Sequence, residues 1–255
     1  MKKRGIIFIA LIIISLLSFV VVFVAENITK AEIKTGLMGW WKFDDASSAN
    51  PADSSGQGNN ASTTTMVAGD WVAGKVRTAL SFPGLTGASA RYVSIPRSSS
   101  LNLSTALTLC AWMYPRAGTN NGIIHKGTLA NGQPDYGFGI STTNRILFRL
   151  NGAASDVNST NNSLPFNTWT HACGTYDKVK QILYINGMVN NSTTFSANIT
   201  DTANSQVFIG VYYSNLYTFN GNVDDLRIYN RTLSANEVKE LYAWPRRSVG
   251  SSLIR

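Results

Sequence analysis

The stretch FNGNVDDLRIYNRTLSANEVKELY, residues Phe219 to Tyr242, indicates which secondary structure ends the chain's folded domain. It joins an apolar, strand-like run to a short amphipathic segment. Ser234, followed three residues later by Glu237, forms a capping box, in which each residue satisfies a backbone N–H group at the start of a helix. Apolar residues then recur at helical spacing: Val238, Leu241 and Tyr242. The stretch therefore predicts a strand followed by a turn and a single helix near the end of the chain.

Two adjacent acids, Asp224 and Asp225, lie inside the strand-like part of this stretch. Adjacent side chains of a strand point to opposite faces of the sheet. We therefore expect Asp225 to share a face with Val223, and Asp224 to share a face with Leu226. On that basis the two acids cannot act together as a catalytic carboxylate dyad.

Upstream of this stretch, apolar residues recur with period two, and clusters of Gly, Asn, Ser and Pro separate the runs. Short strands between turn-rich segments are typical of a sandwich or barrel. Asn186 and Gly187 mark a tight hairpin, because both accept the positive φ angles of a primed turn. We predict an all-β fold, a two-sheet antiparallel β-sandwich. The predicted strands are residues 37–43, 77–82, 91–95, 106–114, 121–126, 136–140, 145–150, 168–176, 180–185, 206–210 and 222–229.

The N-terminus carries a long apolar segment. Residues Ile6 to Ala25 contain no charge, and three cations precede them at positions 2, 3 and 4. A membrane-spanning helix needs about 20 apolar residues, whereas the apolar core of a signal peptide usually has about 7–15. We predict that residues 1–25 form an uncleaved signal anchor, a transmembrane helix that leaves the rest of the chain outside. Two alternatives stay open: a cleaved signal peptide with secretion, and processing at KRGII, as in pilin-like precursors.

The rest of the chain divides into three predicted parts: a stalk at residues 26–36, one domain at 37–244 and a flexible tail at 245–255. The net charge of +8 is concentrated at the two ends of the chain. Residues 26–244 contain 16 basic and 14 acidic side chains, a balance of only +2. Because attraction to phosphates scales with the number of cations brought to them, nucleic acid is not an expected partner.

The chain has two cysteines, Cys110 and Cys173, each in the middle of a predicted strand. Outside the membrane they would face an oxidising environment. They can form a disulfide only if their strands are neighbours and both side chains lie on one face. The alternative is two small buried apolar residues. Nine N-x-S/T sequons give mild support to an exported, glycosylated surface.

Six segments occur in the order found in a known family. They are GLMGWWKFDD, DSSGQGNNAS, GKVRTALSFPG, YVSIPRSSSLNLSTALTLCAWMYP, FNTWTHACGTYDKVKQILYINGMV and FNGNVDDLRIYNRTLSANEVKELY. In this order they resemble laminin-G-like, concanavalin A-like jelly-roll domains over about residues 37–242. The resemblance implies two stacked antiparallel sheets, a shallow groove on one of them, and first and last strands that lie close together. It also implies binding of carbohydrate or protein outside the cell and, in many members, a structural calcium ion.

A calcium site follows from the resemblance and from the loop DSSGQGNN. Calcium takes about 6–8 oxygen ligands, partly from backbone carbonyls of a tight loop. Asp53 offers a carboxylate, Asn59 or Asn60 an amide or main-chain oxygen, and Asp224 a second carboxylate from the far end of the domain. Of the two asparagines, Asn59 is the predicted ligand. The alternative is that Asp53 begins an Asx turn and that Asp224 pairs with an arginine or with backbone amides.

The sequence does not favour a glycosidase, since that chemistry needs two carboxylates astride the bond that breaks. The four glutamates, at positions 26, 32, 237 and 240, lie at the ends of the domain. Neither His125 nor His171 falls in a metal-binding spacing, and no G-x-S-x-G nucleophile turn occurs. We expect a protein without catalytic activity.

Exposed aromatic residues in loops often mark contact surfaces. The segments QPDYGFG and GVYYSNLYTFNG bring such residues into loops. The residues expected to contact a ligand are Asp135, Tyr136, Tyr212, Tyr213 and Tyr217. The alternative for each tyrosine is packing at the edge of the sandwich. Three tryptophans alternate with apolar neighbours and are expected in the core instead: Trp41, Trp112 and Trp169.

We therefore expect an extracellular jelly-roll domain, anchored in the membrane through residues 6–25, that binds a glycan or a cell-surface protein. The alternative function is structural. In that case the chain is a pilin-like or cell-envelope subunit, and the sandwich decorates a filament.

Overall fold

The computed structural model describes residues 33–45, 50–117, 121–130, 134–152, 155–212 and 216–250. The chain divides into two units, Met1–Thr35 and Gly36–Arg255, and the sandwich lies in the second. The predicted signal anchor, its pilin-like alternative and most of the predicted stalk lie outside the described residues. Among the residues that are described, no helix is both long enough and apolar enough to cross a membrane.

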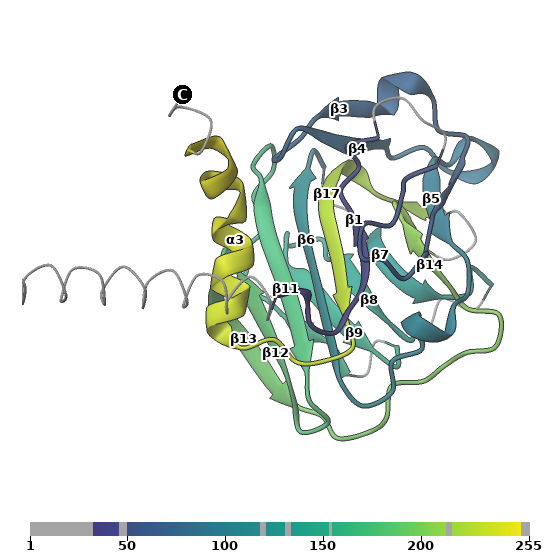
Figure 1. The fold of residues 1–255 in the computed structure, drawn as a ribbon. Helices are drawn as coiled ribbons and strands as arrows, with labels where there is room; N and C mark the ends of the chain where they lie inside the picture. The colour runs from purple at the N-terminus through teal and green to yellow at the C-terminus, as the bar shows by residue number, and fades with distance from the viewer. Residues whose placement is uncertain are drawn as a thin grey trace, which may run out of the picture. The chain divides into compact units, whose positions relative to one another are not determined.

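The first sheet is antiparallel and has the strand order β13-β12-β11-β6-β17-β4-β3, with β1 also paired to β17 (Figure 1). Its strands are β1 (Leu37–Trp41), β3 (Trp71–Ala73), β4 (Thr78–Pro83), β6 (Leu107–Pro115), β11 (Thr170–Tyr176), β12 (Lys180–Ile185), β13 (Met188–Thr194) and β17 (Asn220–Tyr229).

The second sheet is also antiparallel, in the order β10-β9-β8-β7-β14-β5-β2. Its strands are β2 (Ser62–Thr64), β5 (Tyr92–Ile95), β7 (Asn121–Gly127), β8 (Tyr136–Ile140), β9 (Ile146–Leu150), β10 (Val157–Asn158) and β14 (Gln206–Ile209). A small hairpin is formed by β15 (Val211–Tyr212) and β16 (Tyr217–Thr218). Short 3-10 helices are η1 (Ala68–Asp70), η2 (Gly87–Ser89) and η3 (Ser99–Leu101).

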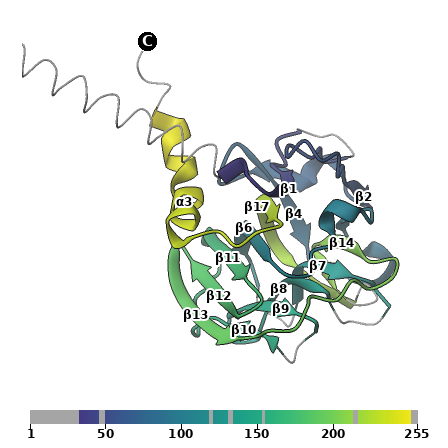
Figure 2. The same ribbon diagram turned by 60° about the horizontal axis from the view of Figure 1, so that its bottom comes forward.

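The two sheets stack face to face (Figures 1 and 2). Alternate residues of their strands fill the space between them. Leu107 and Leu109 of β6 and Phe138 of β8 belong to this core. Side chains of a strand alternate between its two faces, so period-two sequences place one apolar set inside. Burying each such side chain contributes about 1.5–3 kcal/mol. The predicted all-β, two-sheet antiparallel sandwich is confirmed.

The last strand, β17, connects the two ends of the domain. Its second half pairs with β1, with Leu226 opposite Trp41 and Tyr229 opposite Leu37. Its first half pairs with β4, and β6 runs along its other side. The first and last strands therefore lie side by side, as the family resemblance implied.

A β-bulge at the acid pair changes the expected alternation. The register of β17 on β6 shifts between Asp224 and Arg227, so β17 contains an extra residue there. Asp225 has φ of 48°, a left-handed conformation in which Asp is enriched. Val223 and Leu226 both belong to the core. The prediction that strict alternation continues through the two acids, and separates Val223 from Leu226, is therefore wrong.

The predicted C-terminal helix is α3 (Ala235–Gly250) (Figure 1). The backbone N–H of Ser234 donates to Oε2 of Glu237 at 2.7 Å, and the N–H of Glu237 donates to Oγ of Ser234 at 3.3 Å. The predicted capping box is therefore confirmed. Val238 and Leu241 are buried on one side of the helix. The helix continues into the segment that was predicted to be a flexible tail.

A second buried cluster lies on the outer face of the first sheet, against α3. Cys110 of β6 and Cys173 of β11 are directly opposite each other and form a disulfide, one of the two outcomes left open by the sequence. Trp112, two residues along β6, stacks on Tyr242 of α3 with ring centroids 5.6 Å apart. The helix thus covers the disulfide face of the sheet.

The three tryptophans predicted for the core have different positions. Trp41 lies in the main core. Trp112 is buried, but on the opposite face of its sheet, beside α3. Trp169 is half-buried, with its ring 5.4 Å from that of Tyr114. A strand covered on both faces carries apolar residues on both, so alternation alone does not identify the face that points into the core.

Candidate functional site

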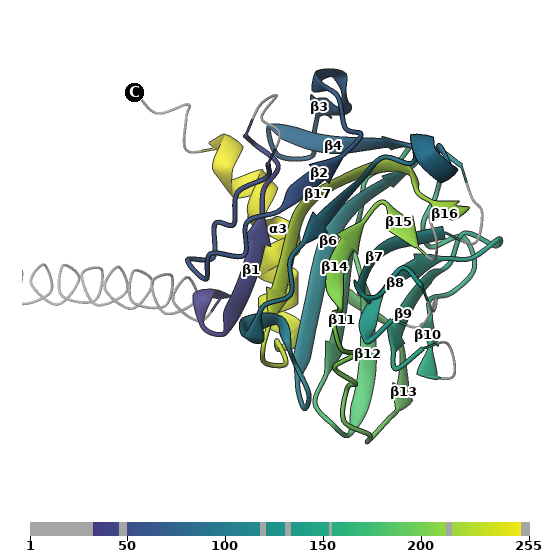
Figure 3. The same cartoon turned by 90° about the vertical axis from the view of Figure 1, so that its right-hand side faces the viewer.

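A groove lies on the face of the second sheet that is turned away from the core. Its lining residues come from β7, β8, β9 and the β15–β16 hairpin. The hairpin lies against β7 (Figure 3). Its volume is about 300 Å³, which is within the range of small-molecule sites. The lining residues that give it its character are His125, Gly137, Gly139, Arg149, Tyr212 and Tyr217.

Glycines form the floor of the groove. In β8, which reads YGFGI, Tyr136 and Phe138 point into the core, so Gly137 and Gly139 face the groove. A Cβ atom on Gly137 would overlap the backbone of Ile124 on the neighbouring strand. Without side chains on this side, β8 presents bare backbone that a ligand can approach closely.

Aromatic rings form one wall of the groove. Tyr212 ends β15 and Tyr217 begins β16, with ring centroids 6.4 Å apart. Gly122 of β7 makes room for this wall, because a Cβ atom there would overlap the Tyr212 side chain. Tyr217 is 43% exposed. An exposed aromatic face at the rim is a surface on which the apolar side of a ring-shaped ligand can stack.

His125 is packed between two aromatic rings, with centroids 5.2 Å from Phe208 and 5.1 Å from Tyr212. Burial lowers the pKa of His125 to about 4, although the Val211 carbonyl and the charge of Asp135 favour the protonated form. The imidazole is therefore neutral at pH 7. It contributes shape to the groove and no charge.

Arg149 of β9 brings a permanent positive charge to the groove. Its Nε lies 3.0 Å from Oδ2 of Asp156, and its Nη1 donates to the Tyr212 hydroxyl at 3.4 Å. Burial raises the pKa of Asp156 to about 6, against the opposing effect of Arg149. Asp156 does not line the groove; it lines a second cavity of about 220 Å³.

Two of the five residues predicted to contact a ligand, Tyr212 and Tyr217, line the groove. Tyr213 lies outside the described residues. The prediction is wrong for Asp135 and Tyr136, because both are fully buried and cannot touch a ligand at the surface.

Asp135 belongs to a buried charge cluster. The Nζ of Lys126 donates to Asp135 and to Asp201, each at 2.9 Å, and to the Ser205 hydroxyl at 2.7 Å. The side chains of Lys126 and Asp135 are only 2% and 1% exposed. A buried charge is tolerated when it is paired and hydrogen-bonded. This acid is therefore part of a buried ion-pair cluster and does not contact the groove.

The glycine floor and Arg149 were not predicted from the sequence. The glycines were visible, because YGFGI places Gly at every second position and so predicts one bare face of a strand. Arg149 gave no such signal. A single arginine in RILFRL is typical of a solvent-exposed position in a half-buried strand.

Asp53 and Asn59, two of the predicted calcium ligands, lie together in a hydrogen-bonded turn. The Asp53 carboxylate accepts from the N–H groups of Trp40 at 3.0 Å, Ser55 at 2.8 Å and Asn59 at 2.9 Å, and from the Ser55 hydroxyl at 2.8 Å. Asn59 Nδ2 donates to the Met38 carbonyl at 2.7 Å. These contacts are those of the Asx-turn interpretation of Asp53.

Asp224, the third predicted ligand, lies on β17 beside the turn between β3 and β4. Its Oδ2 accepts from the N–H of Val76 at 2.8 Å. Its Oδ1 is buried and has no hydrogen-bond partner among the residues described. Burial raises the pKa of Asp224 to about 8, and the charges of Asp225 and Asp44 act in the same direction.

Asp225 has a different set of contacts. Its carboxylate lies 3.0 Å from Nη2 of Arg227 and accepts from the Trp40 indole N–H. The Arg227 guanidinium lies over the Trp40 ring at 4.3 Å and is 5.7 Å from the Trp244 ring. Asp224 therefore binds the turn between β3 and β4, while Asp225 pairs with Arg227, which also contacts the rings of Trp40 and Trp244.

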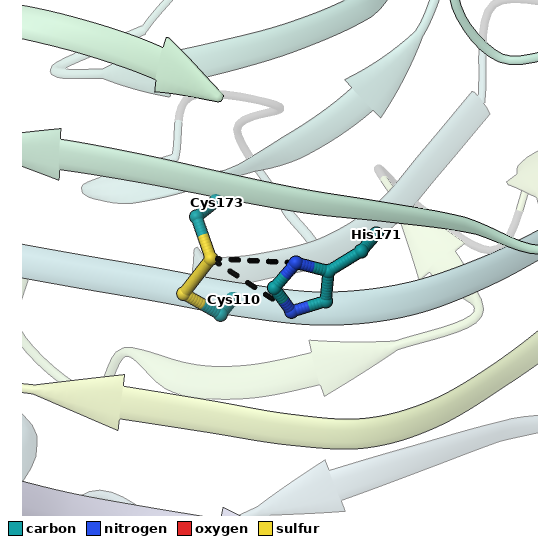
Figure 4. A group of neighbouring side chains, drawn as sticks. All are labelled: Cys110, His171 and Cys173. Carbon is teal, nitrogen blue, oxygen red and sulfur yellow. Dashed lines mark hydrogen bonds between the residues drawn. A yellow bond between two sulfur atoms is a disulfide. The ribbon is translucent and has the colours of Figure 1, made fainter. Parts of the chain in front are cut away.

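Within the described part of the chain, one group of His, Cys, Asp and Glu side chains lies close enough to share a metal ion: Cys110, His171 and Cys173 (Figure 4). The His171 ring nitrogens are 4.0 and 3.9 Å from Sγ of Cys173. The two sulfur atoms are joined to each other, and metal binding requires thiolates. Burial lowers the pKa of His171 to about 3. In its oxidised form the group is therefore part of the packing on the outer face of the first sheet.

Two stacked antiparallel sheets with a groove on one outer face define a lectin-like jelly roll. The chain belongs to the concanavalin A-like lectin/glucanases superfamily, whose family model matches residues 86–239. Usherin of Rattus norvegicus is 25% identical over 156 residues, which are 58% of this chain and 3% of usherin. Usherin of Homo sapiens is 26% identical over 152 residues, which are 56% of this chain and 3% of usherin. The chain thus spans a small part of these relatives.

Solved structures share the fold. Domain 4 of AbnA, a GH43 extracellular arabinanase from Geobacillus stearothermophilus in complex with arabinotriose, has a TM-score of 0.60 at 21% identity, covering 81% of this chain and 98% of that one. The binding domain of Paraclostridial Mosquitocidal Protein 1 has a TM-score of 0.66 at 20% identity, and the match covers 83% of this chain and 53% of that one. The binding domain of Botulinum Neurotoxin DC in complex with SialylT has a TM-score of 0.65 at 14% identity, and the match covers 84% of this chain and 52% of that one.

Proposed function

We propose that this domain binds a glycan in the groove over β7, β8 and β9. The observation that carries the proposal is a glycine floor beside an aromatic wall. Gly137 and Gly139 let a ring lie close to the sheet, and Tyr212 and Tyr217 offer faces on which it can stack. Arg149 adds hydrogen-bond donors. Sugar rings have an apolar face and a rim of hydroxyl groups, so they require both kinds of contact.

Two solved structures with this fold support the proposal. The arabinanase domain was solved with arabinotriose and the neurotoxin binding domain with SialylT. Those ligands belong to those proteins, and the shared feature is the architecture. The argument for this chain therefore depends on the residues of its own groove.

We propose binding without hydrolysis. None of the described residues that line the groove is Asp or Glu. The segments 131–133 and 213–215, which adjoin lining residues in the sequence, contain no acid either. Cleavage of a glycosidic bond requires a carboxylate on each side of it. Asp156 is paired with Arg149 and lines a different cavity.

We further propose that the domain acts outside the cell, with surface glycans or proteins as partners, and that residues 6–25 hold it at the membrane. The Cys110–Cys173 disulfide supports an oxidising location, since disulfides persist there. N-terminal sequencing of the mature protein tests the anchor. A start at Met1 agrees with it, whereas a start at Glu26 indicates secretion and a start at Ile6 indicates pilin-like processing.

Calcium binding is a separate proposal, and it rests on Asp224. Its unpartnered buried Oδ1 fits a cation, which would remove the cost of burying a carboxylate. Asp53 fits less well, because both its oxygens already accept hydrogen bonds within the turn. We expect calcium to raise the melting temperature of the wild type and not that of Asp224→Asn. An unchanged wild-type midpoint after chelation would remove the metal from consideration.

A glycan array probed with the purified full-length protein in detergent tests the main proposal. We expect bound glycans for the wild type and their loss in Tyr217→Ala. Phe166→Ala is the matched control, because Phe166 is also an exposed aromatic, at 39%, but does not line the groove. Loss of binding in the control but not in Tyr217→Ala would contradict the assigned site, and a blank array would contradict glycan binding.

A further inference from the structure

The groove contains one fixed positive charge, that of Arg149, whose ion-pair partner Asp156 lies outside the groove. Among the lining residues that the structure describes, Arg149 is the only one charged at pH 7, since His125 is neutral and no carboxylate lines the groove. A ligand in the groove therefore meets one guanidinium group and otherwise aromatic rings, apolar side chains and glycine backbone. Such a site favours a ligand with one negative group.

Asp156 is paired with Arg149, but it does not lie where a ligand would lie. It lines the second cavity, together with Ser155 and Thr194, and is absent from the groove. Its contact with Arg149 is through Nε, at 3.0 Å. A guanidinium has five N–H donors in a planar fork, so a contact at Nε fixes its orientation and leaves terminal N–H groups for another acceptor. The terminal Nη1 is the atom that contacts Tyr212, a wall residue of the groove.

We propose that the groove selects glycans that carry a carboxylate, as uronic and sialic acids do, and that Arg149 recognises this carboxylate. The inference rests on the proposed glycan-binding function. The guanidinium fork matches a carboxylate through two parallel hydrogen bonds. The Arg149 side chain is only 20% exposed, so screening by water is reduced. Asp156 acts as a positioning residue.

Isothermal titration calorimetry with matched ligand pairs tests this inference on the full-length protein in detergent. One pair is trigalacturonic acid and its methyl ester, and the other is 3′-sialyllactose and lactose. In at least one pair we expect the acid to bind about tenfold more tightly than its neutral partner, because charge-assisted hydrogen bonds are roughly twice as strong as neutral ones. In Arg149→Met the ratio of the two affinities should fall to about one.

Two further variants separate recognition from support of the fold. Asp156→Asn keeps the shape of the positioning residue and removes its opposing charge, so the preference for the acid should increase several-fold. Tyr217→Ala should weaken both members of a pair to a similar degree. Thermal melting confirms that each variant is folded. If Arg149→Met does not fold, Asp156→Asn still decides the question.

The outcomes distinguish the two proposals. Three outcomes would overturn selection by charge and leave glycan binding intact. The first is equal affinity for the acid and its neutral partner in both pairs, and the second is an unchanged ratio of the two affinities in folded Arg149→Met. The third is an array on which only neutral glycans bind. An unchanged or lower preference in Asp156→Asn would also overturn it. If no glycan binds at all, both proposals fail.

Discussion

Removing the Cys110–Cys173 disulfide should destabilise the domain substantially. The two cysteines are 63 residues apart in the sequence, and closing a loop of that length restricts the unfolded chain by about 4 kcal/mol at 25 °C in the chain-entropy description. For a domain of about 200 residues, 1 kcal/mol corresponds to about 2–4 °C in Tm, so the melting temperature should fall by about 8–16 °C. The assay is urea and thermal unfolding of the oxidised wild type beside a Cys110→Ala/Cys173→Ala variant.

The single variant Cys173→Ala provides the control for this prediction. The remaining cysteine is a small buried residue, so the single and double variants should unfold within about 1 kcal/mol of each other. Titration of free thiols must first show that the wild-type bond is formed. If it is formed, and the wild type and the double variant still have equal stability, the loop-closure reasoning is refuted.

Three further predictions concern buried groups. His125 and His171 stay neutral in the folded protein but take up a proton below pH 6.5 when unfolded, so stability should fall by about 3 kcal/mol for each between pH 6.5 and 4. Urea unfolding at both pH values should show a smaller loss for His171→Phe, and an equal loss would contradict this. Asp135→Ala leaves the Lys126 charge with the Ser205 hydroxyl and with Asp201, whose side chain is 37% exposed. We expect the free energy of unfolding in urea to fall by about 3 kcal/mol, and a change below about 0.5 kcal/mol would argue against the pairing. Leu241→Ala should cost about 2–5 kcal/mol, because Leu241 is 2% exposed, and amide hydrogen exchange should rise first in α3 and not in β7.

Local patterns predicted the fold well where local chemistry determines the structure. Asn186 and Gly187 have φ of 51° and 79° at the turn between β12 and β13, as a primed hairpin turn requires. Ser234 and Glu237 begin α3 as the capping box indicates. In both places the determining residues are neighbours in the sequence, so no knowledge of the tertiary structure was needed.

The site was less predictable because it depends on residues that are distant in the sequence or on a local irregularity. From the sequence, Asp135 is an acid in a loop. Its burial is explained by the position of Lys126 on β7 and by hydrogen bonds from Thr200 and Thr202. Strict alternation cannot anticipate the extra residue at Asp225. Arg149 becomes a candidate binding residue only once the β15–β16 hairpin places Tyr212 beside it.

The central place of β17 has a consequence for how the chain acquires its structure. Of the strands described, this one is the last to be synthesised, yet β1, β4 and β6 all pair with it. Until it arrives, the earlier strands have open edges that can pair with other chains. The first sheet therefore cannot be completed before β17 has emerged, and a nascent polypeptide that stalls before β17 should be a substrate for chaperones or proteases.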